Sequence, residues 1–253
     1  MLYSVIRCLT HFPLFLVFSL LLVSCSTDRP EGKTEAEVLY KEALKLMDEG
    51  RFILATEKLN SLRSQHPYSY FATHAELLQS DILFKQENYV ESASAYILFR
   101  DFHPKHEKIT YVIWRIAESF FNQLPETFDR DLSPGVEAIK YYQELIDKYP
   151  GNEYFAKAKE KIQQINKSFE EKEQYVADFY FKTKVYDAAR YRYLNIMKNF
   201  STQSLLDHSA IRILKASLKL NDMEGCKKYA EKFSKMVSEK TSSQMSEVAK
   251  TCI

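Results

Sequence analysis

The chain has 253 residues, of which 45% are hydrophobic and 27% are charged, and 35 basic against 34 acidic side chains give a net charge of +1. Only 5 residues are glycine, far below the roughly 7% that is typical of proteins. Because β-hairpins and phosphate-binding loops depend on glycine, the composition disfavours an all-β sandwich and a glycine-rich nucleotide site. The balanced charge argues against a disordered chain and against nucleic-acid binding. Helices joined by short turns are therefore expected.

Residues 1–24 have the pattern of a secretory signal peptide that is removed from the mature protein. Arg7 supplies the positive charge, residues 12–23 are uncharged and apolar, and the small residue Ser24 precedes Cys25. This apolar run is short for a membrane-spanning helix. A plain N-terminal membrane anchor is the alternative.

The end of this segment, Leu22-Val23-Ser24-Cys25, resembles the lipobox of bacterial lipoproteins. The resemblance implies that Cys25 is acylated and becomes the first mature residue, and Ser26 after it implies the outer membrane as destination. Several acyl chains on one cysteine anchor a protein firmly. Residues 25–34 are polar and are expected to form a lipidated, flexible tether.

The rest of the chain repeats a motif in which a turn is followed by a large apolar residue and, three positions later, by a small one. The four copies are Phe52 with Ala55, Tyr89 with Ser92, Tyr186 with Ala189, and Met223 with Cys226. The large residues are 37 positions apart within the first two copies and within the last two, and Pro67 and Pro104 share that spacing. Each unit is expected to form two amphipathic helices, and its small residue is expected to lie where the two helices cross. The pattern resembles the tetratricopeptide repeat (TPR).

The predicted fold is all-α, a right-handed superhelical solenoid of about five TPR helix-turn-helix repeats. Residues 35–152 are expected to form the N-terminal half with repeats one to three, and residues 153–253 the C-terminal half with repeats four and five. Residues 153–182 predict one long helix that repeats three and four share, with a free coiled coil as the alternative. Residues 239–253 are mostly polar and are expected to fray.

Two cysteines, Cys226 and Cys252, remain after the signal peptide and the acylated cysteine are set aside. In an oxidising compartment they could form a disulfide, which would stabilise the fold by roughly 3 kcal/mol. Two unpaired thiols are the alternative, because pairing does not follow from sequence alone.

Motifs that carry chemistry are missing from the sequence. There is no HExxH pair, GxSxG, GxGxxG or Walker A sequence, and His103-Pro104-Lys105-His106 lies at a repeat-ending turn, where a solvated turn is expected. Adjacent carboxylates such as Glu170-Glu171 have lysines around them, as on a solvated helix face. The chain is therefore expected to be no enzyme and to need neither a cofactor nor a metal.

Two surfaces are candidate binding sites instead. On the first helices of repeats one and two, apolar residues exceed what the core stripe needs, and such a groove would suit an extended client segment. Its residues are Tyr40, Leu44, Met47, Leu77, Asp81 and Phe84. Packing of these side chains against the tether or neighbouring helices is the alternative.

The second candidate is the second helix of repeat four, where Arg190, Tyr191 and Arg192 combine residue types that are enriched at interface hot spots. Tyr193 takes a core position by repeat spacing, so Tyr191 and Arg192 are the better candidates for partner contact.

Taken in order, the lipobox, the tether, the repeats and the linking helix resemble the BamD/ComL family, the TPR lipoproteins of the outer-membrane β-barrel assembly machinery. The local fragments that carry this resemblance are His66-Pro67-Tyr68-Ser69, His103-Pro104, residues 109–112, residues 148–154 and residues 175–180. Ser201 departs from the family, because a repeat-ending proline is common there.

The resemblance implies a scaffold on the periplasmic face of the outer membrane. Its implied partners are a periplasmic domain of the barrel-forming subunit, other assembly lipoproteins and unfolded outer-membrane proteins. It also implies that Arg192 matches a family arginine that pairs with an acidic residue of the barrel-forming subunit. A TPR lipoprotein pilot for pilus or secretin assembly and a peptidoglycan-binding lipoprotein are the alternatives.

Overall fold

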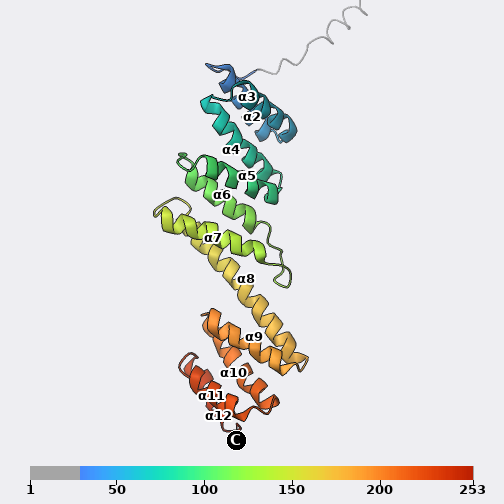
Figure 1. Ribbon diagram of the computed structural model, residues 1–253, viewed down its shortest axis with the longest axis vertical. Helices are drawn as coiled ribbons and strands as arrows, with labels where there is room; N and C mark the ends of the chain where they lie inside the picture. The colour runs from blue at the N-terminus through green and yellow to red at the C-terminus, as the bar shows by residue number, and fades with distance from the viewer. Residues whose placement is uncertain (1–28, 253) are drawn as a thin grey trace, which may run out of the picture. The chain divides into compact units, whose positions relative to one another are not determined.

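The computed structural model describes residues 29–252, so the predicted signal peptide and Cys25 lie outside the described residues. This part of the chain holds eleven helices and no strand (Figure 1): α2 (Glu35–Asp48), α3 (Phe52–Gln65), α4 (Tyr70–Lys85), α5 (Tyr89–Phe102), α6 (Ile109–Phe121), α7 (Ser133–Lys148), α8 (Phe155–Lys182), α9 (Tyr186–Asn199), α10 (Gln203–Lys219), α11 (Met223–Phe233) and α12 (Glu239–Ala249). The all-α fold of paired helices is confirmed for these residues.

The chain forms two compact units that divide between Ile82 and Leu83, within α4. The boundary predicted between residues 152 and 153 falls in the loop that joins α7 to α8, and it stays a prediction.

In the first unit, α2 begins at a cap that the sequence provides. The backbone N–H of Glu37 donates to the hydroxyl of Thr34 at 3.2 Å, which satisfies one of the donors left open at a helix start. The core of this unit is formed by the apolar faces of α2 and α3, as the helical spacing of their apolar residues predicts. Ala43 on α2 and Leu59 and Leu62 on α3 are fully buried. Amphipathic spacing alone was enough to predict this hairpin.

Four of the helix–helix turns share one geometry and recur with the predicted period. The left-handed positions are Gly50, Glu87, Lys184 and Asn221, with φ between 56° and 74°; Gly50 and Glu87 are 37 residues apart, as are Lys184 and Asn221. In each turn the left-handed residue and the one after it donate to carbonyls of the last helical turn, as in Gly50 N–H to Met47 O at 3.1 Å and Arg51 N–H to Leu46 O at 2.8 Å. This is the Schellman motif, which satisfies carbonyls at a helix end.

The small residue of each repeat motif is fully buried, as predicted. Ala55, Ser92, Ala189 and Cys226 all have no exposed surface, and Ser92 Oγ lies 3.2 Å from Ser119 Oγ on α6. A larger side chain at these positions would push the crossing helices apart.

The second unit continues from Leu83, and each of its helices from α5 to α11 packs against the next one in sequence. The loop between α6 and α7 folds onto α8, since Phe128 lies 5.8 Å from Tyr175 between ring centroids. Close by, α7 approaches α8 at Gly135, where an added Cβ would lie 2.8 Å from Cγ2 of Ile165. Helix α8 is the predicted long helix, and its packing against both α7 and α9 excludes the free coiled coil within this part of the chain.

The C-terminal segment is ordered, which corrects the expectation that residues 239–253 fray. Ser238 caps α12 by accepting the Thr241 N–H and donates its hydroxyl to Asp207 of α10 at 2.6 Å. Met245 is buried against the core of the second unit. The mostly polar composition predicted fraying, but the segment also contains a helix cap and the buried residues Met245 and Cys252, which hold α12 against its neighbours.

Cys226 on α11 and Cys252 after α12 form a disulfide in the structure, with their Cα atoms 5.9 Å apart. Both residues are fully buried. The bond closes α12 onto the last hairpin.

Candidate functional site

Helix α9 carries the predicted partner-contact residues on its outer side. Tyr191 is 64% exposed, and Arg192 next to it keeps 38% of its side chain exposed. Tyr193, by contrast, is fully buried, as its repeat position predicted. Since successive residues of a helix are about 100° apart, Tyr191 faces solvent opposite the core while Arg192 lies toward α8.

Arg192 forms one long ion pair within the chain. Its Nη1 lies 3.5 Å from Oε2 of Glu173 on α8, and both side chains are partly exposed. An ion pair of this length in contact with water contributes at most about 1 kcal/mol. The guanidinium can therefore exchange Glu173 for a carboxylate on another protein at little loss.

Arg190 contacts the next hairpin of the chain. Its Nη1 donates to the Ser217 hydroxyl of α10 at 3.1 Å and also to Asp222. Asp222 in turn caps α11 by accepting the Gly225 N–H at 2.9 Å, and this bond with that from Arg190 lowers the pKa of Asp222. Arg190 thus ties α9 to the next hairpin through Nη1, and its predicted role as a contact residue stays a prediction.

A polar cluster below the exposed face fixes how α8, α9 and α10 pack. The hydroxyl of Tyr193 donates to Oδ1 of Asp178 at 2.5 Å, and Nε2 of His208 lies 2.8 Å from the same oxygen. Partial burial would raise the pKa of Asp178, but the hydrogen bonds from Tyr193 and His208 and the charge of nearby Arg212 lower it. Burial and the bond to Asp178 raise the pKa of Tyr193. Sequence reasoning missed this cluster because its members are far apart in the chain and follow no motif.

The predicted client groove of repeats one and two is largely filled by its own side chains. Leu77 is only 4% exposed, which corrects its assignment to an open groove. Tyr40, Leu44 and Met47 are half-buried and pack against the core of the first unit; the Tyr40 ring centroid lies 5.6 Å from that of Phe71. The alternative of packing against neighbouring helices therefore describes most of these residues, and only their outer edges reach solvent.

The remaining two groove residues lie in different units. Asp81, in the first unit, is partly exposed, and its charge adds to burial in raising the pKa of Tyr40. Phe84, in the second unit, contacts Tyr89 at 5.3 Å between ring centroids and is covered by the guanidinium of Arg115 at 4.4 Å. Such a cation–π contact favours a fixed position for Phe84.

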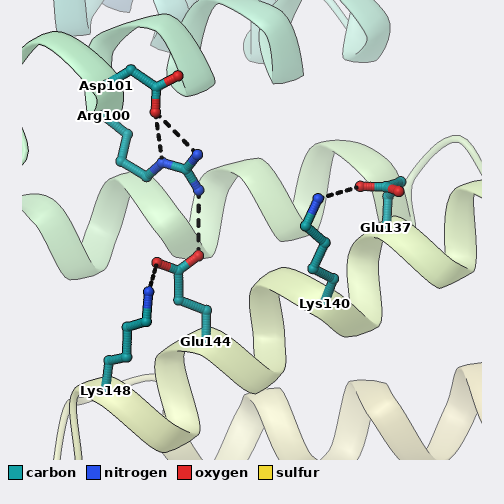
Figure 2. Close-up of polar contacts among 6 residues, drawn as sticks. All are labelled: Arg100, Asp101, Glu137, Lys140, Glu144 and Lys148. Atoms are coloured by element: carbon teal, nitrogen blue, oxygen red, sulfur yellow. Dashed lines mark hydrogen bonds and ion pairs between the residues drawn. The ribbon is translucent and has the colours of Figure 1, made fainter.

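A charged clamp joins α5 directly to α7 (Figure 2). Nη1 of Arg100 lies 3.3 Å from Oε2 of Glu144, whose other oxygen accepts from Lys148 at 3.1 Å. The Arg100 guanidinium also lies 5.2 Å from the Tyr141 ring centroid. Such partly exposed pairs add little stability. No sequence pattern pointed to this clamp.

Within the described residues no group of three or more His, Cys, Asp or Glu side chains is placed to hold a metal ion. In the same part of the chain, no helix is both long enough and apolar enough to cross a membrane.

Comparison with known proteins places the chain among outer membrane lipoproteins. The YfiO family, described as "Outer membrane lipoprotein", matches residues 32–236. The "Outer membrane protein assembly factor BamD" of Rickettsia prowazekii (strain Madrid E) is 26% identical over 216 residues, which cover 85% of this chain and 86% of the relative. The protein of the same name from Neisseria gonorrhoeae is 26% identical over 219 residues, covering 80% and 82%.

Among solved structures, the complex titled "TPR2AB-domain:pHSP90-complex of yeast Sti1" aligns with a TM-score of 0.46 and 14% identity, covering 81% of this chain and 78% of that chain. The family match is the informative result, because it spans every helix from α2 to α11. The chain belongs to the YfiO family of outer membrane lipoproteins.

Proposed function

We propose that the chain is a lipid-anchored subunit of the machinery that assembles outer-membrane proteins, where it acts as a scaffold and not as an enzyme. The family match over residues 32–236 and the relatives named as outer membrane protein assembly factors support the role. The lipobox that ends at Cys25 supports an anchor in the outer membrane with the helical body on the periplasmic face.

In this proposal, α9 contacts the periplasmic domain of the barrel-forming subunit. The observation that carries it is Arg192, whose pairing with Glu173 at 3.5 Å is long and open to solvent. Tyr191 adds a large exposed aromatic ring one residue away. An exposed arginine beside an exposed tyrosine is the composition of interface hot spots, and the pairing partner would be an acidic side chain.

The first unit offers a smaller surface for unfolded clients. The half-buried side chains of Tyr40, Leu44 and Met47 expose their outer edges around an apolar core, which suits weak contact with extended apolar segments. A photo-crosslinker at Met47 should capture unfolded outer-membrane protein segments, whereas one at Lys157, on α8, should not.

Charge reversal on α9 tests the partner surface. The full lipoprotein with Arg192→Glu is purified from outer membranes in mild detergent. The amount of barrel-forming subunit that co-purifies should fall at least about tenfold, because a like-charge contact replaces an ion pair. Lys198→Glu makes the same change of charge at an exposed position on the same helix and should keep the partner.

Two results would overturn the assignment. One is equal recovery of the barrel-forming subunit by the Arg192→Glu and Lys198→Glu variants. The other is recovery of a secretin or pilus component in place of a barrel-assembly subunit by the unaltered protein.

A further inference from the structure

The first unit has a hollow of about 520 Å³ between the end of the tether and the α2–α3 hairpin. Four basic side chains line it, namely Arg29, Lys45, Arg51 and Lys58, against two acidic ones, Glu42 and Glu49. The lining therefore has a net charge of +2, although the whole chain is nearly neutral.

The acidic side chains do not cancel this local charge. Glu42 is held by Arg29 at 2.6 Å and by Lys58 at 2.7 Å; its partial burial would raise its pKa, but these two cations lower it. Lys45 forms no ion pair among the described residues, and Arg51 lies 3.3 Å from Glu49 in a solvent-exposed pair. Lys45 and Arg51 are thus the cations available to an outside anion.

Apolar side chains adjoin the hollow on its α3 side. Leu54 forms part of the lining, and Ile53 beside it is 74% exposed at the first turn of α3. Exposed aliphatic residues next to basic ones are typical of surfaces that lie in the headgroup region of a membrane.

The hollow also lies close to the predicted lipid anchor. Arg29 follows Cys25 by four residues, and because a fully extended chain spans at most about 3.6 Å per residue, the chain between them covers at most about 14 Å. An acyl anchor this close in the chain would hold the hollow near the headgroup layer, where tethering raises the effective concentration of lipid.

We infer that this hollow and Ile53 form a membrane-docking surface that binds the phosphate of an anionic phospholipid headgroup. Lys45 and Arg51 contact the phosphate, and Ile53 enters the acyl boundary. The anchor at Cys25 then sets where the protein is held, and this second contact sets which side of the first unit faces the bilayer. The inference rests on acylation of Cys25, which belongs to the proposed function.

Vesicle binding tests this inference without the acyl chain. The mature chain with Cys25→Ser keeps every described residue, and it should sediment with phosphatidylcholine vesicles that contain phosphatidylglycerol but not with phosphatidylcholine alone. Each basic residue near an anionic surface changes the partition coefficient about fivefold, so Lys45→Gln with Arg51→Gln should weaken binding about 25-fold. Ile53→Ser should weaken binding in low-salt and in high-salt buffer alike, because salt does not screen an apolar contact.

Matched variants make the outcome decisive. Lys157→Gln with Lys227→Gln removes the same charge from exposed positions of the second unit and should leave binding within twofold. An equal loss in this control, or no preference for phosphatidylglycerol, overturns the inference. Binding of millimolar glycerol phosphate in solution without any binding to vesicles also overturns it, in favour of a soluble phosphate ligand. No assembly partner is present in this assay, so its failure leaves the proposed assembly role standing, and failure of the α9 pull-down leaves the membrane contact standing.

Discussion

Replacing the left-handed lysine in the turn between α8 and α9 with glycine should stabilise the protein. Lys184 has φ of 67°, where its Cβ approaches the following carbonyl at a cost of about 1–2 kcal/mol, which glycine avoids. Against this gain, glycine lowers the free energy of unfolding by about 0.5–1 kcal/mol, because it loses more conformational freedom on folding than lysine does. The free energy of unfolding of Lys184→Gly should therefore rise by roughly 0.5–1 kcal/mol, which shifts the melting temperature of a chain of this size by about 2–4 °C per kcal/mol.

Urea denaturation followed by circular dichroism measures this change as a higher midpoint with an unchanged slope. The control is Lys167→Gly, an exposed position in the middle of α8, which should lose about 1 kcal/mol because glycine is a poor helix former. Gly50→Ala should also lose stability, since Gly50 has φ of 74° with nothing near its missing Cβ, so only the backbone opposes the alanine. The reasoning is refuted if Lys184→Gly lowers the midpoint as Lys167→Gly does.

Three further variants test packing, partner binding and acid response. Gly135→Ala should lose about 1–3 kcal/mol of stability by overpacking, because its Cβ would lie 2.8 Å from Cγ2 of Ile165, and adding Ile165→Leu, which removes that Cγ2 branch, should recover part of the urea midpoint. Glu173→Gln frees Arg192 from its 3.5 Å partner and should tighten partner binding up to about fivefold by calorimetry; weaker binding would mean that Glu173 itself contacts the partner. Because folding lowers the pKa of Asp178 below its ordinary 3.8, its contribution to stability is present above that value and is lost as the pH falls through the lowered pKa. Asp178→Asn should reduce the acid dependence of the melting temperature, and an unchanged profile would count against the cluster.

The fold was predictable because its determinants are local and repeated. Phe52 and Tyr89 predicted the turns before them, and the structure places a left-handed residue two positions ahead of each. The sequence did not predict that glutamate and lysine would occupy such positions, since glycine is the residue expected there. The repeat spacing therefore predicted these turns, whereas a search for glycine would have missed the turns at Glu87 and Lys184.

The candidate site was less predictable because exposure depends on partners that are distant in sequence. Arg190 and Arg192 look equivalent on a helix, yet Arg190 bonds to Ser217, 27 residues away, while Arg192 lies 3.5 Å from Glu173 in a partly exposed ion pair. Likewise, Leu77 was assigned to an open groove because its helix has more apolar residues than one stripe needs, and the structure buries it. Periodicity predicts which face of a helix is apolar but not how far neighbouring side chains cover that face.

Helix α8 connects these observations, because one continuous helix serves both repeats that it joins. Ile165, in its first half, packs against Gly135 of α7, while its second half supplies Glu173 to Arg192 and Asp178 to Tyr193. Its 28 residues include neither glycine nor proline, and sharp kinks in helices arise mainly at such residues. A partner that binds α9 therefore also acts on α8, because α9 packs against the second half of α8 and α7 packs against its first half. We expect the two repeats to move together when the partner binds.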